Sequence, residues 1–171
     1  MLAGVKVTDL KKIHDERGFF CELLRSDWKE LLGLDSIAQT NLSMSYPGVA
    51  RAWHRHGRGQ IDYLVLLRGA TMICIYDDDK GSVTHGHLNE IIGGPTNYQV
   101  VRIPGHYWHG TKTISDEPSL SLYFTTQLYD YTNPDEDRRP WNDSTIVPTL
   151  INNRKDEPRI GKPWDWNQLP T

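Results

Sequence analysis

The chain has 171 residues, of which 37% are hydrophobic and 24% are charged, with a net charge of -3. This length and composition predict one folded domain over residues 1–171 and exclude a disordered chain. The weak negative charge provides no basic surface for nucleic acid and no polybasic patch for a membrane, so we expect neither partner. No apolar run approaches the roughly 18 residues of a membrane span, and the first residues lack the apolar stretch of a secretory signal. We therefore expect a cytoplasmic protein.

Strand patterns dominate the chain after one short helix. The helix is expected in "RSDWKELLGL", with Ser26 or Asp27 as N-cap and Gly33 as the stop. Two β-runs, 63–67 and 70–76, flank a tight turn at Arg68 and Gly69, and "NYQVVRIPG" reads as a strand that ends at a Pro-Gly pair. In 119–125 apolar and polar residues alternate with a period of two. Short strands with turns between them predict an antiparallel sandwich or barrel, followed by an irregular arm over about 159–171.

Two histidines two residues apart, His54 and His56, precede a hydrophobic strand in "VARAWHRHGRGQIDYLVLLRG". Side chains at i and i+2 of a strand share a face, so both imidazoles point the same way. A third histidine, His109, follows a Pro-Gly turn in "RIPGHYWHG". The cluster could be a set of metal ligands, a catalytic base with a helper, or a binding site for a polar ligand. As ligands, the three imidazoles could hold zinc, iron, manganese or nickel, with Gln60 or Asp62 completing the set.

The order of these motifs resembles the signature of the cupin superfamily. Gly48 is followed after five residues by His-x-His, then by an acid or amide position, a Pro-led turn and a third histidine. The resemblance implies an all-β fold, a cupin-type antiparallel β-barrel or jelly roll with a few short helices. The usual carboxylate of the superfamily's ligand set is here an amide, Gln60.

A second resemblance covers about residues 15–158. "DERGFFCELLRSDW", the Gln39-x-Asn41-x-Ser43 segment, "GVARAWH", the turn over 104–110 and "WND" occur in the order typical of the dTDP-4-dehydrorhamnose 3,5-epimerase family. Those enzymes act on a nucleotide-linked 4-keto-6-deoxy sugar and need no cofactor. The resemblance implies that His54 is the base, that Asp156 orients it, and that Tyr123 is the acid. His109 would lie near the developing enolate.

The same resemblance implies the substrate contacts. Arg17 and Arg51 match pyrophosphate contacts, a role that suits the guanidinium group, and Glu22, Gln39 and Asn41 match nucleotide-side contacts. In the family, Arg17 acts on the site of the neighbouring subunit, which implies a homodimer. Arg51 lies three residues before His54, so strict alternation turns it away from the site unless a bulge intervenes.

The active strand departs from the epimerase pattern. Asp62 occupies the place of the lysine that stabilises the enolate in the family, and His56 replaces a glutamine. "RAWHRHGRGQ" is also similar to the motif of dTDP-sugar 3,4-ketoisomerases. We place His56, Gln60 and Asp62 among the substrate-contacting groups. The favoured hypothesis is a metal-free sugar-nucleotide epimerase or isomerase of deoxysugar and cell-surface polysaccharide biosynthesis. The alternatives are a metal-dependent cupin enzyme using His54, His56 and His109, or a non-catalytic sugar-nucleotide-binding paralogue.

Overall fold

A computed structural model describes residues 1–169, and strands make up most of its regular structure. The elements are β1 (Lys6–Asp9), β2 (Lys12–Asp15), β3 (Gly18–Cys21), α1 (Lys29–Leu32), β4 (Gln39–Ser45), β5 (Ala50–Arg55), β6 (Ile61–Arg68), β7 (Thr71–Tyr76), β8 (His87–Gly93), β9 (Gln99–Pro104), β10 (Trp108–Thr113), β11 (Ser119–Thr125), β12 (Asp137–Arg138) and β13 (Leu150–Ile151).

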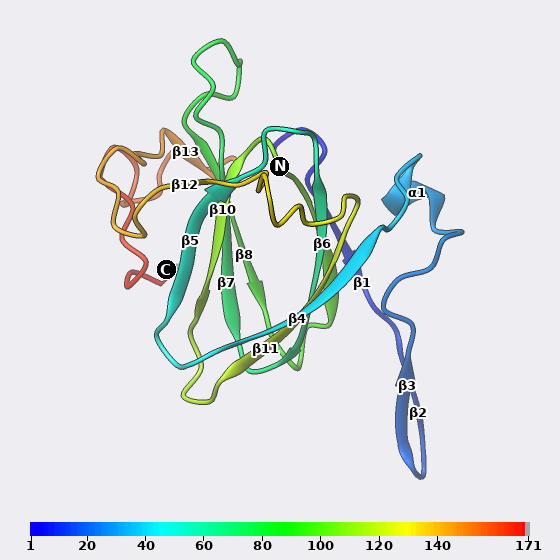
Figure 1. The fold of residues 1–171 in the computed structure, drawn as a ribbon. Coiled ribbons are helices and arrows are strands. Elements are labelled where there is room, and N and C mark those ends of the chain that lie inside the picture. Colours follow the sequence, from blue (N-terminus) through cyan, green and yellow to red (C-terminus); the bar gives the residue numbers. More distant parts are fainter. Residues whose placement is uncertain (170–171) are drawn as a thin grey trace.

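Two large sheets face each other, as Figure 1 shows. The first has the strand order β1-β9-β6-β11-β4, and the second has the order β12-β5-β10-β7-β8-β13. Neighbouring strands are antiparallel, apart from the parallel pair of β13 and β8. The predicted all-β, jelly-roll class is therefore confirmed, although the sheets remain two separate layers and do not close into a barrel.

Apolar side chains form a cluster between the sheets and another on the outer face of each sheet. Leu64 of β6 and Ile103 of β9 meet Ile73 and Ile75 of β7 between the layers. The outer face of the five-stranded sheet packs on α1 and the neighbouring segment, and the outer face of the six-stranded sheet packs on the C-terminal segment. Where the outer faces are covered in this way, outward-facing apolar residues of the two sheets are buried.

The two predicted β-runs are present as β6 and β7, but they do not pair as a hairpin, because β6 belongs to the five-stranded sheet and β7 to the six-stranded one. They are joined by a tight turn in which Gly69 has a φ of 73°. This conformation suits glycine because a Cβ would be strained there. The helix begins later than predicted: α1 starts at Lys29 after Trp28, without a side-chain cap, and ends as expected at Gly33. Neither predicted cap forms, and the carboxylate of Asp27 instead binds the guanidinium of Arg25.

The final segment is irregular in its described part, residues 159–169, and residues 170 and 171 of the expected arm lie outside the described residues. It packs closely on the six-stranded sheet: Trp164 and Trp166 are buried, and the Trp166 ring lies 4.8 Å from that of Trp53 on β5. Within residues 1–169 no helix is long and apolar enough to cross a membrane.

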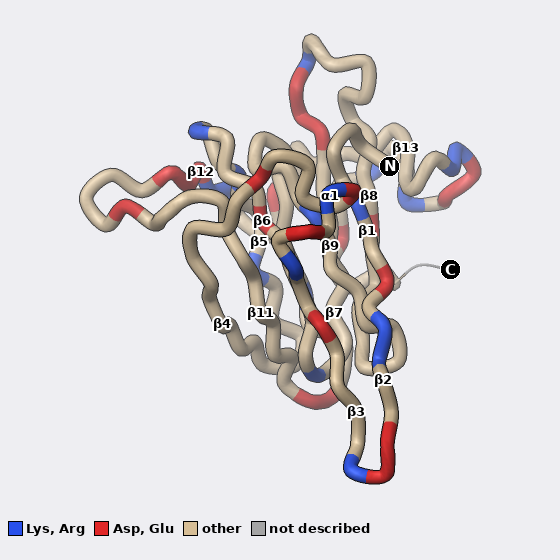
Figure 2. Tube along the Cα trace, turned by 90° about the vertical axis from the view of Figure 1, so that its right-hand side faces the viewer, with Lys and Arg blue, Asp and Glu red and all other residues tan. Residues whose placement is uncertain are grey.

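The hairpin of β2 and β3 projects away from the two sheets (Figure 1). Its turn contains acidic and basic residues (Figure 2). Among them, Arg17 forms an ion pair with Asp15 at 2.5 Å. Three apolar side chains on its strands, Ile13, Phe19 and Phe20, are exposed to solvent.

Candidate active site

A cavity of about 790 Å³ opens between the two sheets. Strand β4 shows how the sequence builds this cavity, because its half-buried residues, which are all polar, alternate with exposed ones. The residues that face the cavity are Gln39, Asn41, Ser43 and Ser45. The alternate residues Leu42 and Met44 are exposed on the opposite face. Strand β4 therefore contributes a row of polar side chains to the cavity.

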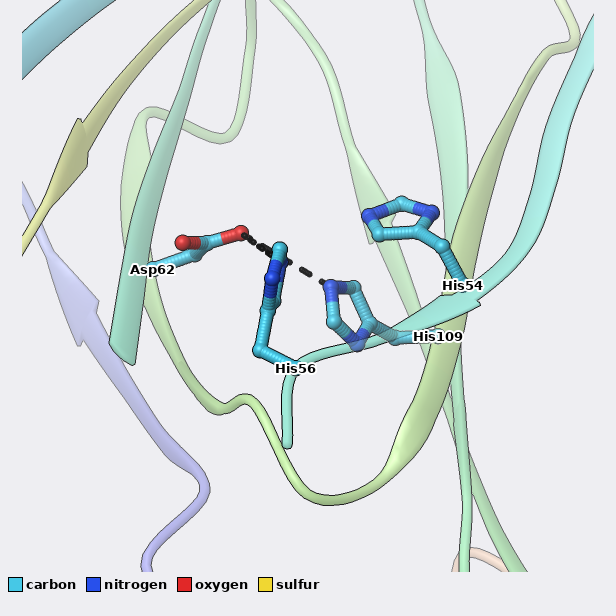
Figure 3. Close-up of side chains that lie close together, drawn as sticks. All are labelled: His54, His56, Asp62 and His109. Atoms are coloured by element: carbon cyan, nitrogen blue, oxygen red, sulfur yellow. Dashed lines mark ion pairs between the residues drawn. The ribbon is translucent and has the colours of Figure 1, made fainter. Parts of the chain in front are cut away.

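Three imidazoles and one carboxylate that line this cavity lie close together (Figure 3). His54 and His56 come from β5 and the segment after it, His109 from the paired strand β10, and Asp62 from β6 of the opposite sheet. Asp62 Oδ2 lies 3.8 Å from His56 Nε2 and 3.7 Å from His109 Nε2. The His54 and His109 ring centroids are 4.2 Å apart.

Backbone carbonyls hold two of these rings in a fixed orientation. His56 Nδ1 lies 2.7 Å from the carbonyl oxygen of Asp135, and His109 Nδ1 lies 2.9 Å from that of Tyr107. A carbonyl can only accept, so each Nδ1 donates its N–H to a carbonyl, and each Nε2 faces the carboxylate of Asp62. Gln60 Nε2 donates to Asp62 Oδ1 at 2.8 Å and lies 3.2 Å from His56 Nε2.

His54 differs from its two neighbours because, among residues 1–169, its ring has no hydrogen-bond partner and no ion pair with a carboxylate. Burial lowers the pKa of His54 well below its usual range, and the nearby His109, His56 and Arg138 lower it further. The ring is therefore neutral near pH 7 and can accept a proton.

Tyr123 reaches the same cavity from β11, in the sheet opposite β5. Burial raises the pKa of its phenol, and the negative charges of Asp62 and Glu136 raise it further. The phenol is thus protonated near pH 7. A proton acceptor and a proton donor face the cavity from its two sheets.

Among the residues implied to contact substrate, Gln39, Asn41 and Arg51 all line the cavity. The pairing of β5 with β10 shifts register between His109 and Thr111. This irregularity breaks the strict alternation that would turn Arg51 away from the face of His54, so Arg51 reaches the cavity. The Arg51 guanidinium donates to Ser45 Oγ at 2.7 Å.

Three residues implied by the resemblance lie elsewhere. Asp156 does not line the cavity; its side chain is 81% exposed and it pairs with Arg154, so the expected pair with His54 is absent. Glu22 pairs with Arg25 beside a separate surface depression. Arg17 lies on the projecting hairpin, outside this chain's own cavity.

Part of the segment 130–139 also lines the cavity, although no sequence motif predicts this. Its strand β12 pairs with β5, with Arg138 opposite His54. Asp135 accepts hydrogen bonds from the backbone of Gly57 and Arg58, and its carbonyl fixes His56. The one sequence feature that could have indicated this role is the segment's run of charged residues, and such a run is equally typical of a solvated loop.

Comparison with known proteins identifies the family to which the chain belongs. The family model described as dTDP-4-dehydrorhamnose 3,5-epimerase matches residues 1–159, and the chain belongs to this family. The resemblance predicted from the sequence motifs is confirmed.

Several relatives support the assignment. The chain is 49% identical over 138 residues to a probable low-salt glycan biosynthesis epimerase of Haloferax volcanii, covering 81% of this chain and 87% of the relative. It is 40% identical over 146 residues to a spore coat polysaccharide biosynthesis protein of Bacillus subtilis, covering 85% and 94%. Among solved structures, a dTDP-6-deoxy-D-glucose-3,5-epimerase of Legionella pneumophila, in complex with dTDP-4-keto-L-rhamnose, aligns with a TM-score of 0.74 and 29% identity, covering 83% and 76%.

Proposed function

We propose that this protein is an isomerase or epimerase that acts on a dTDP-linked 4-keto-6-deoxy sugar in deoxysugar and cell-surface polysaccharide biosynthesis. Family membership and the names of its relatives support the substrate class. The observation that carries the proposal is the placement of a neutral imidazole and a protonated phenol on opposite sheets of one cavity.

The chemistry requires a proton to leave a carbon next to the keto group and a proton to return. The adjacent carbonyl acidifies this C–H bond, and His54 accepts the proton as the electron pair moves onto the keto oxygen. Tyr123 then donates its phenolic proton to the carbon of the enolate from the other side of the cavity, which inverts the centre. Water in the open cavity can return the phenolate and the imidazolium to their starting states.

The remaining lining residues would bind the two ends of the substrate. Arg51 provides a guanidinium suited to pyrophosphate, and Gln39 and Asn41 provide amides for the nucleotide side. His56, Gln60, Asp62 and His109 surround the position of the sugar ring. The chain would act as one cytoplasmic domain.

The projecting hairpin supports a homodimer. Arg17 lies at its tip, and Phe19 and Phe20 expose apolar surface that a partner could cover. In a dimer that exchanges this hairpin, Arg17 would reach the neighbouring subunit's cavity. Glu22, which follows β3, would be carried towards the same interface.

A 3,4-ketoisomerase reaction is the second candidate, because His56 stands beside His54 with its tautomer fixed and can relay hydroxyl protons. Both reactions begin with proton abstraction next to the carbonyl. They differ in whether the product is an epimer or a 3-keto sugar.

The test is turnover of dTDP-4-keto-6-deoxyglucose by the purified protein, with the product identified by NMR. We expect an epimer or a 3-keto isomer, and a loss of about 10²- to 10⁴-fold in rate for His54→Asn. His85→Asn, at an exposed position outside the cavity, is the matched control and should retain the rate. An inactive wild-type protein that still binds the nucleotide sugar would instead favour a binding paralogue.

A further inference from the structure

We propose that Arg138 binds the diphosphate of the substrate together with Arg51, and that Glu136 holds the Arg138 side chain until the substrate displaces it. The identity of this ligand, a nucleoside diphosphate linked to a sugar, rests on the proposed function. Arg138 belongs to the part of the cavity wall that no sequence motif indicated.

The charges around the cavity create a need for more than one cation. Four acidic residues line it: Asp62, Asp130, Asp135 and Glu136. Among residues 1–169, the basic residues that line it besides histidines are three arginines: Arg51, Arg138 and Arg139. A doubly negative diphosphate can enter an acid-rich cavity only where cations face it, because like charges repel in a partly enclosed space.

The three arginines differ in how far they are free to bind a ligand. Arg139 is held by two carboxylates, those of Asp78 and Asp143. The guanidinium of Arg51 donates to two neutral groups, the hydroxyl of Ser45 and a backbone carbonyl. Within residues 1–169 it forms no ion pair, so its charge is available to the ligand but matches only part of the diphosphate charge.

The register of β12 on β5 turns Arg138 towards the cavity. β12 lies beside β5 (Figure 1), with Arg138 directly opposite His54, and residues opposite each other share one face of a sheet. The neighbouring pair, Asp137 and Arg55, lies on the other face, where the two side chains bind each other at 3.0 Å. After burial and the nearby histidines, the charge of Arg138 also lowers the pKa of His54, as expected for a cation on the same face.

The contact of Arg138 with Glu136 is one that a phosphate can replace. Arg138 Nη2 lies 2.6 Å from Glu136 Oε2, and the Arg138 side chain is 76% exposed, so the pair is open to solvent on one side. Such ion pairs contribute little stability. A guanidinium binds a phosphate through two parallel charge-assisted hydrogen bonds, so Arg138 gains by exchanging the carboxylate for the ligand.

The test is the affinity of the full-length protein for dTDP, which contains the diphosphate without the sugar, measured by calorimetry. We expect Arg138→Gln to weaken binding by about 10- to 100-fold, because charge-assisted hydrogen bonds are lost. Arg138→Lys should weaken it less, because the charge remains. Arg55→Gln is the matched control: it breaks an ion pair between the same two strands on the other face and should bind as the wild type does. Circular dichroism establishes that each variant is folded.

Glu136→Gln tests the exchange of partners. Without the competing carboxylate, dTDP should bind about 2- to 5-fold more tightly. The gain should be smaller when Arg138→Gln is already present, because no guanidinium is then released. An equal gain in both backgrounds would show that Glu136 acts on the ligand directly and would overturn the exchange.

Equal dTDP affinity of the wild type and folded Arg138→Gln would overturn the proposal, and so would a wild type that does not bind dTDP. If dTDP affinity stayed equal while Arg138→Gln lost deuterium exchange into the keto sugar, the charge of Arg138 would act at the sugar and not at the diphosphate. Deuterium exchange also tests the proposed function separately. Arg138-dependent dTDP binding by a wild type without exchange retains the diphosphate contact and fails the proposed function.

Discussion

Tyr123 is the side chain whose chemistry depends most on its surroundings. Burial and the nearby negative charges keep its phenol protonated, and β11 places it across the cavity from His54. We expect Tyr123→Phe to lower product formation by about 10²- to 10⁴-fold, because the proton donor is lost. The measurement is NMR of the product together with solvent-proton exchange.

The same experiment distinguishes a donor from a packing residue. Proton abstraction by His54 should persist in Tyr123→Phe, so solvent exchange should exceed product formation. Tyr46→Phe, at an exposed tyrosine, is the matched control. Equal loss of exchange and product would argue that Tyr123 only shapes the cavity.

Asp156 is the residue for which the structure and the sequence disagree most. The resemblance implies a partner of His54, whereas the structure gives it an exposed pair with Arg154. Exposed pairs contribute about 1 kcal/mol or less. We therefore expect Asp156→Asn to keep kcat/KM within about twofold and the free energy of unfolding within about 0.5 kcal/mol. A loss of 100-fold or more in kcat/KM would restore Asp156 to the catalytic set.

Among the elements, the β5–β10 pair positions both His54 and His109, and Gly110 sets how closely these strands approach. A Cβ at Gly110 would lie 2.3 Å from the Cβ of Ala52 and 2.8 Å from its Cα. Since backbone must move to relieve this overlap, we expect Gly110→Ala to lower the free energy of unfolding by about 3 kcal/mol. Urea denaturation measures the change.

Gly81→Ala is the matched control, because its added Cβ would meet only Asp79 Oδ1 at 3.4 Å. It should change the free energy of unfolding by less than about 0.5 kcal/mol. Equal stability of the two variants would show that β5 and β10 can admit a Cβ at position 110 without loss of stability.

The elements also show what sequence reasoning could reach. Local patterns sufficed for the strands β6 and β7 and the turn between them, for the strand ending at Pro104 and for the shared face of His54 and His56, because periodicity and turn chemistry are properties of neighbouring residues. They did not show that β6 and β7 lie in opposite sheets. Placing Asp135 under His56 required a contact across 79 residues of sequence, which no local pattern encodes. The predicted cap of α1 is absent for a local reason, because the carboxylate of Asp27 binds the guanidinium of Arg25.

At the scale of the whole molecule, a buried ion cluster ties the C-terminal segment to the six-stranded sheet. Arg159 donates to both oxygens of Glu90 at 2.8 Å and to Glu157 Oε1 at 2.9 Å. Arg159→Ala leaves two buried carboxylates without a cation, so we expect a loss of about 3 to 5 kcal/mol in unfolding free energy at pH 7. Chemical denaturation of the variant and the wild type measures it.

Arg68→Ala, which breaks the exposed pair with Glu117, is the control and should lower the free energy of unfolding by less than about 1 kcal/mol.

The stabilisation by the Arg159–Glu157 contact depends on pH. The hydrogen bond from Arg159 lowers the pKa of Glu157 below its usual 4.5, so this stabilisation is present above pH 4.5 and is lost as pH falls through the folded-state pKa. A difference between wild type and Arg159→Ala that grows on acidification would contradict the account.

The projecting hairpin of β2 and β3 leads to a prediction about dimer formation. Phe20 is 62% exposed on β3, and we expect Phe20→Asp to convert a dimer into a monomer, because a charge at a buried apolar contact is costly. Light scattering after size exclusion measures the mass. Leu34→Asp, at a fully exposed position away from the hairpin, should remain dimeric. A wild-type protein that is monomeric at all concentrations would show that the hairpin does not contribute Arg17 to the cavity of a neighbouring subunit.

Exchange of solvent deuterium into dTDP-4-keto-6-deoxyglucose in D₂O tests the central claim most directly, because it reports proton abstraction whatever the final product. The account predicts that the wild type incorporates deuterium at C3, at C5 or at both, and that His54→Asn abolishes the incorporation while His85→Asn does not. Wild-type protein that binds the nucleotide sugar without incorporating deuterium, or His54→Asn that exchanges at the wild-type rate, would contradict it.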